Sequence, residues 1–192
     1  MKKNTFLYLI IILFSISCKA QQYPLDTDYK TIPNYSYLKD TNNSLLPYVG
    51  NWKATYSGNE IILKIEKTDN HFRNFNIKKF YEDVLFMHYI IKNQQGNIVE
   101  STMNINTTDS NIISDMIFPS DNLISFTYTG GQCTVGWGSI NLKMIDSTHF
   151  QWNYQPESTI ITNKNCPDYP TGGITINLPY NPDYVDLVFT KQ

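Results

Sequence analysis

From Val49 onward, hydrophobic and polar residues alternate in short runs that turn-forming residues separate. In the first run Trp52, Ala54 and Tyr56 share one face of an extended chain, with polar residues between them. A second run with the same period follows the turn at residues 57–59, so the two runs predict a β-hairpin.

The same alternation predicts further strands. They cover residues 84–92, 98–103, 112–118, 123–128, 135–145, 149–154 and 184–191. Residues 71–82 can be read either as a helix or as part of a strand, because some apolar positions there have helical spacing. We favour a strand that begins near Val84, after a break in the strand pattern at residues 68–70. Eight to ten short strands without a long helix predict an all-β fold, an antiparallel up-and-down β-barrel, with a β-sandwich as the alternative.

The first eighteen residues have a different character. A basic start at residues 1–4 is followed by an apolar run from Phe6 to Ile16 and by Ser17 and Cys18, which is the organisation of a secretory signal peptide. The apolar run is too short for a membrane-spanning helix, which needs about twenty residues. An ordinary signal peptide with a chance cysteine is the other alternative.

The segment that ends at Cys18 resembles the lipobox of bacterial lipoproteins, although Ser15 stands where leucine is usual. The resemblance implies that residues 1–17 are removed and that Cys18 becomes acylated. Because Lys19 rather than aspartate follows, it also implies the outer membrane of a Gram-negative bacterium. The lack of acidic residues at 19–22 favours the periplasmic face.

Three segments follow from these expectations. Residues 1–17 form the signal peptide, residues 18–47 a lipidated N-terminus and tether, and residues 48–192 the barrel domain. The tether has no sustained period and contains several prolines, but its tyrosines leave open that residues 35–46 dock on the barrel.

With Cys18 assigned to lipid, Cys133 and Cys166 remain as an even pair in an oxidising compartment. We predict a disulfide between them, with two separate thiols as the alternative. The bond would pin the long loop from Pro156 to Tyr180 to the strand near Cys133.

Two stretches carry a family resemblance. Residues 49–56, Val-Gly-Asn-Trp-Lys-Ala-Thr-Tyr, resemble the Gly-x-Trp strand of lipocalin-like domains, in which the tryptophan plugs one end of the barrel. The chain also resembles a group of short, uncharacterised bacterial lipoproteins with a domain of unknown function, which share the lipobox, this strand, a strand like Phe150–Gln151–Trp152 and a final Lys-Gln. A lipocalin-like barrel is implied, and no catalytic residues are.

Charge and composition narrow the function classes. The chain has 15 Lys and Arg against 17 Asp and Glu, and loss of Lys2 and Lys3 with the signal peptide sets the side-chain charge at −4. This balance excludes a nucleic-acid footprint. Aromatic residues form 14% of the chain, which favours β structure over disorder.

No motif for catalysis or metal binding stands out. The three histidines are far apart, and four glutamates are spread along the region of the predicted sheet: His71, His88 and His149; Glu60, Glu66, Glu82 and Glu100. Catalytic zinc usually keeps three protein ligands, and no serine lies in a Gly-x-Ser-x-Gly elbow. We therefore expect no catalytic residue, no metal and no cofactor.

Aromatic residues are the best candidates for binding. Trp52, Tyr56, Trp137 and Trp152 are the candidate lining of a ligand cavity inside the barrel, with a packed core as the alternative. We expect a non-catalytic envelope lipoprotein that binds a small apolar ligand or an envelope component. The alternative is a filled barrel that binds a protein partner through residues 156–180, and a hydrolase is the third reading.

Overall fold

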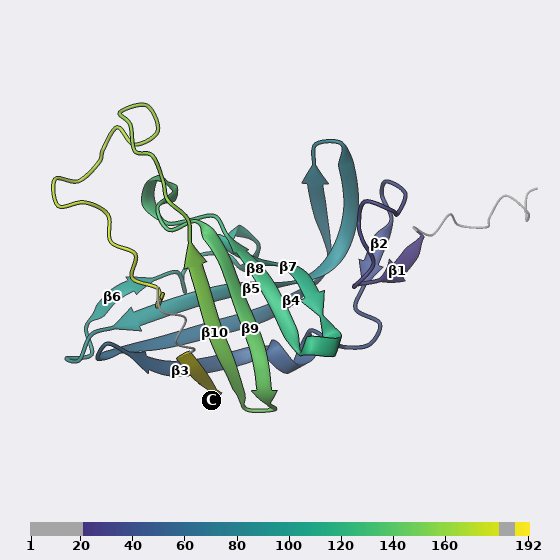
Figure 1. Cartoon of the computed structure of the whole chain (residues 1–192), viewed down its shortest axis with the longest axis horizontal. Helices are drawn as coiled ribbons and strands as arrows, with labels where there is room; N and C mark the ends of the chain where they lie inside the picture. Colours follow the sequence, from purple (N-terminus) through teal and green to yellow (C-terminus); the bar gives the residue numbers. More distant parts are fainter. Residues whose placement is uncertain (1–20, 181–186) are drawn as a thin grey trace, which may run out of the picture.

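The structure, a computed structural model, describes residues 21–180 and 187–192 (Figure 1). Within these residues eight antiparallel strands close into a barrel in which each strand pairs with the next and the last with the first. The barrel strands are β3 (Gly50–Tyr56), β4 (Asn59–Phe75), β5 (Lys78–Lys92), β7 (Ile112–Phe118), β8 (Leu123–Tyr128), β9 (Gly138–Asp146), β10 (His149–Pro156) and β11 (Leu187–Lys191). The predicted up-and-down, lipocalin-like barrel is thus confirmed over the sandwich.

Side-chain alternation places an aromatic core in the middle of the barrel. Trp52 and Ala54 point inward from β3, as their period predicts. The Trp52 ring packs against Phe150 at a centroid distance of 4.5 Å, and Phe150 stacks on Phe189 at 5.3 Å. Trp152 also contacts Phe189, at a centroid distance of 5.4 Å. Since each fully buried side chain of this kind contributes about 1.5–3 kcal/mol, these rings are a main source of barrel stability.

The hairpin of β4 and β5 is longer than predicted. β4 continues to Phe75 and β5 begins at Lys78, whereas we expected a strand only from Val84. The expected break is a bulge: the register shifts within residues 68–71, where Asn70 adopts a φ of 56°, and the strand resumes. Because β3 pairs only with the first part of β4, the end of this hairpin extends beyond the barrel (Figure 1).

The residues before the barrel lie along the hairpin. β1 (Gln22–Pro24) pairs in parallel with β2 (Tyr37–Lys39), and β2 pairs in parallel with β5. Leu38 and Leu45 are buried, and the 3-10 turn η1 (Leu46–Tyr48) leads into β3. Residues 21–48 are therefore packed against the rest of the described structure.

Three further 3-10 turns and one short strand complete the described chain: β6 (Ile98–Ser101), η2 (Thr107–Asp109), η3 (Pro119–Asp121) and η4 (Gln132–Thr134).

The strand that we predicted over residues 135–145 begins only at Gly138, because the chain turns sharply before it. Cys133 and Thr134 both have positive φ angles, of 55° and 60°. Trp137 consequently lies outside the strand.

Some expectations fall on residues that the structure does not describe. The signal peptide and Cys18 precede residue 21, and the start of the last predicted strand lies within residues 181–186. In the described ranges, no helix combines the length and the apolar character needed to cross a membrane.

Candidate functional site

A pocket of about 260 Å³ lies where the segment 173–178 crosses one end of the barrel. Tyr89 of β5, Tyr128 at the end of β8 and Glu100 of β6 form its barrel side. The volume is slightly below the 300–1,000 Å³ typical of sites for drug-sized ligands. The pocket is therefore suited to a smaller molecule.

Polar groups of this pocket converge on one carboxylate. The Tyr89 hydroxyl donates a hydrogen bond to Oε1 of Glu100, and Nδ2 of Asn177 donates to Oε2 at 2.8 Å. Burial, together with the bond to Glu100, raises the pKa of Tyr89 far above its ordinary value. Burial also raises the pKa of Tyr128. Both hydroxyls hence stay protonated and act as hydrogen-bonding groups rather than as bases.

The rest of the pocket lining mixes apolar side chains with polar ones such as Gln132 and Thr175. Val135 contributes from the turn after η4, and Ile174, Ile176 and Leu178 contribute from the crossing segment. A carboxylate can accept about four hydrogen bonds, and two of these positions are used by Tyr89 and Asn177. The arrangement suits a ligand with one apolar side and one hydrogen-bond donor.

A family profile described as "Family of unknown function (DUF6705)" matches residues 1–192. The chain belongs to the DUF6705 family. No curated protein and no solved structure matches it.

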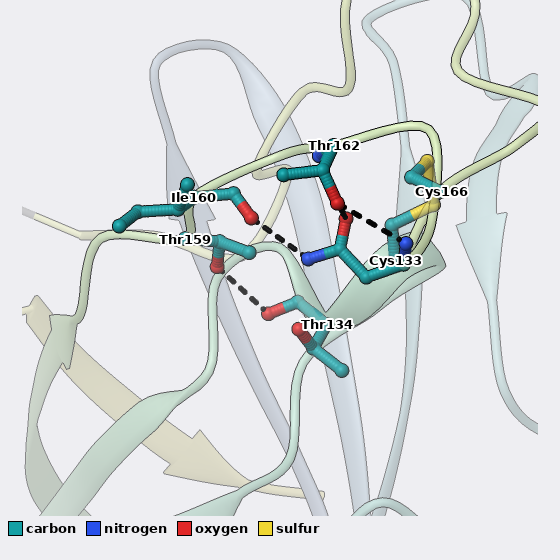
Figure 2. The surroundings of a disulfide bond; sticks show 7 residues. Cys133, Thr134, Thr159, Ile160, Thr162 and Cys166 are labelled. Atoms are coloured by element: carbon teal, nitrogen blue, oxygen red, sulfur yellow. Dashed lines mark hydrogen bonds between the residues drawn. A yellow bond between two sulfur atoms is a disulfide. The ribbon is translucent and has the colours of Figure 1, made fainter.

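In this DUF6705 protein, a disulfide holds the segment that forms the pocket wall. Cys133 and Cys166 are joined, as predicted, with their Cα atoms 5.4 Å apart (Figure 2). Close to the bond, the Thr159 hydroxyl donates to the carbonyl oxygen of Thr134 at 3.2 Å. Asn165 closes the turn before Cys166 through its side chain. The loop is thus fixed to the turn at η4.

Both ends of the same loop are also tied to the barrel. At its start the Glu157 N–H donates to the carbonyl of Trp137 at 2.7 Å. At its end the indole N–H of Trp152 donates to the carbonyl of Pro179 at 2.8 Å, and the Tyr56 hydroxyl to that of Tyr180 at 2.9 Å. The pocket wall is therefore held in place by the disulfide and by hydrogen bonds within the chain itself.

The four predicted lining residues occupy different places. Trp52 and Trp152 lie in the aromatic core, and Trp52 is 0% exposed. Tyr56 sits at the barrel rim, bonded to Tyr180, while Trp137 is 45% exposed and donates to the carbonyl of Ser158. None of the four is among the residues that border the described pocket.

Sequence reasoning missed the residues that do border it. Tyr89 lies on the inward face of a predicted strand, and this face was a usable signal. Glu100 is one of four glutamates spread along the predicted sheet, and no sequence motif marks it out. Its approach to Asn177, 77 positions later in the chain, depends on the path of the loop, which no local pattern encodes.

The histidines of this DUF6705 protein do not form a metal site in the described ranges, where no three His, Cys, Asp or Glu side chains are grouped to hold an ion. His88 is buried on β5, and its Nδ1 lies 2.9 Å from the carbonyl oxygen of Thr102. His149 contacts the carboxylate of Asp146 at the β9–β10 turn.

Proposed function

We propose that this protein is a lipid-anchored envelope protein that binds a small ligand, without catalysis, in the pocket at the end of the barrel. The observation that carries the proposal is the pre-formed pocket wall, held by the disulfide and by both ends of residues 156–180. A wall that is already ordered loses little conformational entropy on binding.

The chemistry of the lining defines the ligand class. Apolar contact with Ile176 and Leu178 accompanies a hydrogen bond to Glu100, so we expect a small amphipathic molecule that carries an amine or a hydroxyl group. The tightly packed aromatic core is the reason to place this ligand at the end of the barrel rather than in its middle.

The envelope location is argued from the sequence. The lipobox resemblance makes Cys18 the lipidated residue and favours the periplasmic face of the outer membrane. Three acyl chains would give effectively permanent anchoring, since each buried methylene contributes about 0.8 kcal/mol. A Cys18→Ala variant should leave the membrane fraction of its host, and its retention there would contradict the lipid anchor.

Native mass spectrometry of the protein purified from its host tests the ligand. We expect an adduct of a small molecule on the wild type and a loss of at least tenfold in occupancy for Glu100→Gln. Glu60→Gln is the matched control, because Glu60 pairs with Lys53 and Lys92 and does not border the pocket. Equal adducts on all three proteins would place the ligand elsewhere, and no adduct would contradict the proposal.

A second candidate is a protein partner that binds residues 156–180. It is favoured by apolar side chains on the outer surface of this loop, where Ile160 is 83% exposed and Tyr169 is also exposed. A protein that co-purifies with the wild type and is lost with Ile160→Asp would support this candidate. Retention of such a protein by the variant would contradict it.

A further inference from the structure

The free end of the β4–β5 hairpin carries apolar side chains that the described structure leaves open to solvent. Ile77, in the turn between the strands, is 94% exposed. Phe72 and Phe75 on β4 are exposed as well. Polar residues are usual in such a turn, and a group of exposed apolar side chains is typical of a surface that contacts a protein or a membrane. We call residues 74–79 the hairpin tip.

Basic side chains surround this hairpin tip. Lys78 and Lys79 begin β5, and Lys30 lies close by, since the Lys78 ammonium group donates to the carbonyl oxygens of Lys30 and Ile32. In the described ranges the salt bridges give none of these three lysines a carboxylate partner. Arg73, by contrast, is neutralised by Glu82. Aromatic and aliphatic side chains ringed by lysines are typical of surfaces that contact anionic membranes.

The direction of the first strand brings the chain start to the same end of the molecule. β1, β2 and β5 are mutually parallel, so their N-terminal ends all point toward the hairpin tip. Gln21 accepts the Tyr37 N–H through its carbonyl oxygen at 2.9 Å, and Tyr37 lies opposite Tyr81. Because Ile77 is four residues before Tyr81, about 14 Å of strand separates the tip from this level.

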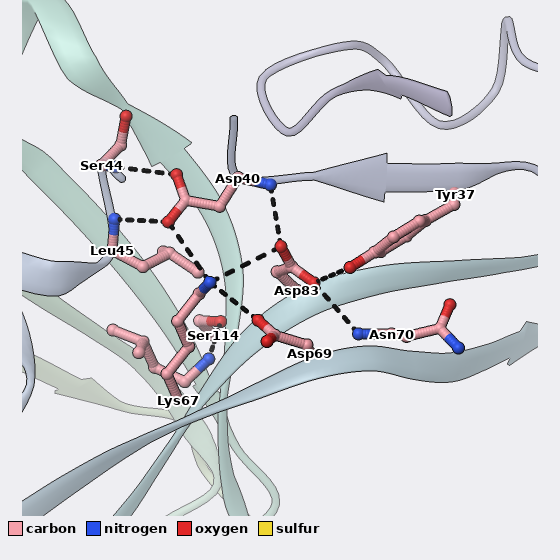
Figure 3. Close-up of polar contacts among 10 residues, drawn as sticks. Tyr37, Asp40, Ser44, Leu45, Lys67, Asp69, Asn70, Asp83 and Ser114 are labelled. Carbon is pink, nitrogen blue, oxygen red and sulfur yellow. Dashed lines mark hydrogen bonds and ion pairs between the residues drawn. The ribbon is translucent and has the colours of Figure 1, made fainter. Parts of the chain in front are cut away.

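A buried polar network fixes this geometry (Figure 3). The Asp83 carboxylate on β5 accepts the Tyr37 hydroxyl, the Asp40 N–H at 2.9 Å and the Asn70 N–H at 3.0 Å. Lys67 lies 3.6 Å from the same carboxylate. The network thereby joins β2 to the β4–β5 hairpin.

The lipid position follows from chain length. Cys18 precedes Gln21 by three residues, which span at most about 11 Å. A lipid on Cys18 would therefore hold the level of Gln21 within about 11 Å of the bilayer surface. The hairpin tip reaches about 14 Å beyond that level, which is enough to contact the bilayer.

We propose that the hairpin tip is a membrane-contact surface for an anionic bilayer. Ile77, with Phe75, enters the boundary between headgroups and acyl chains, while Lys79 faces the lipid phosphates. The orientation rests on the proposed lipid at Cys18. The apolar and basic character of the tip does not depend on that lipid.

The test uses two single tryptophan substitutions in the full chain, processed by its host and reconstituted in vesicles of phosphatidylethanolamine and phosphatidylglycerol with brominated acyl chains. Ile77→Trp places the probe at the tip, and Ile160→Trp places it on a comparably exposed position of the loop at the other end of the barrel. The measured quantity is the tryptophan fluorescence of each variant minus that of the wild type. Brominated lipid should lower this difference at least twofold for Ile77→Trp and leave it unchanged for Ile160→Trp.

A charge variant checks the lipid chemistry. Adding Lys79→Gln to Ile77→Trp should reduce the ratio of membrane-inserted to free tips about fivefold, because one lysine near an anionic surface contributes on that scale. Replacement of phosphatidylglycerol by phosphatidylcholine should weaken quenching in the same direction.

Several results would overturn the proposal. Equal quenching of the two probes would mean that the protein has no preferred orientation on the membrane. If the protein floats with the vesicles but the Ile77→Trp probe is not quenched, the anchor stands and the tip contact is refuted. Dimers in detergent that Ile77→Asp converts to monomers would make the tip a self-interface. If mass spectrometry finds Cys18 unmodified, the lipid anchor is refuted independently of the tip contact. The tip contact is then tested by comparing the quenching of the two probes in the protein that binds to the vesicles.

Discussion

Removal of the disulfide is the most direct test of how residues 156–180 are held. The bond joins residues that are 33 positions apart. In the chain-entropy model, a closed loop of this length restricts the denatured state by about 3.7 kcal/mol at 25 °C. Typical domains have a total stability of about 5–15 kcal/mol, so the loss is a large fraction of the whole.

The double variant Cys133→Ala/Cys166→Ala is the clean perturbation, because it leaves no unpaired thiol at either end of the former bond. We expect urea unfolding to give a free energy about 3–4 kcal/mol lower than that of the wild type. The m-value should rise, because the denatured chain of the variant exposes more surface. Wild-type protein unfolded with reductant present provides a second measurement of the same difference.

The reasoning would be refuted by a loss below about 1 kcal/mol with an unchanged m-value, since a bond that leaves the denatured chain unrestricted cannot act through its entropy. A loss well above 5 kcal/mol would be equally inconsistent, because it would mean that the native barrel depends on the loop. Glu157 and Trp152 hold the two ends of the loop independently of the bond, so the barrel should persist.

Other perturbations have equally definite outcomes. Trp52→Ala should lower the free energy of unfolding by about 3–5 kcal/mol, and the exposed Trp137→Ala by less than about 1 kcal/mol, in the same denaturation assay. Gly130→Ala should lower the melting temperature, because Gly130 has a φ of 90° and an added Cβ would lie 2.4 Å from a backbone oxygen. Hydrogen bonds from the Thr148 N–H and hydroxyl lower the pKa of Asp146 to about 2. Since this folded-state pKa lies below the ordinary value of 3.8, the stabilisation is complete above about pH 4 and is lost as the pH falls toward 2. Carboxyl NMR should find the midpoint near 2, and Thr148→Ala should raise it.

Local alternation was enough to predict the barrel strands. The alternation of apolar and polar side chains determines which face of a strand is buried, and short turns make strands that follow one another in sequence pair. Hairpins such as β3–β4 are therefore encoded within a few residues. The predicted strand 123–128 coincides with β8 for the same reason.

Features that depend on contacts between distant residues were not predictable in this way. The polar run at residues 68–70 resembles a turn, but pairing with β5 on both sides carries β4 through it as a bulge. Trp137 continues the alternation of β9, yet the positive φ angles at Cys133 and Thr134 turn the chain before it. The pocket joins Glu100 to Asn177, and only the tertiary path of the loop brings them together.

The pocket and the hairpin tip lie at opposite ends of β5, and this separation constrains the ligand. Tyr89 follows Lys78 by eleven residues, which is about 36 Å along the strand. If the tip rests on the bilayer, the pocket opens well beyond the headgroups into the aqueous phase. A membrane lipid would have to leave the bilayer completely to reach Glu100, whereas a water-soluble amphipathic molecule arrives by diffusion. The proposed orientation therefore favours a soluble metabolite or a released envelope fragment over an intact lipid as the occupant of the pocket.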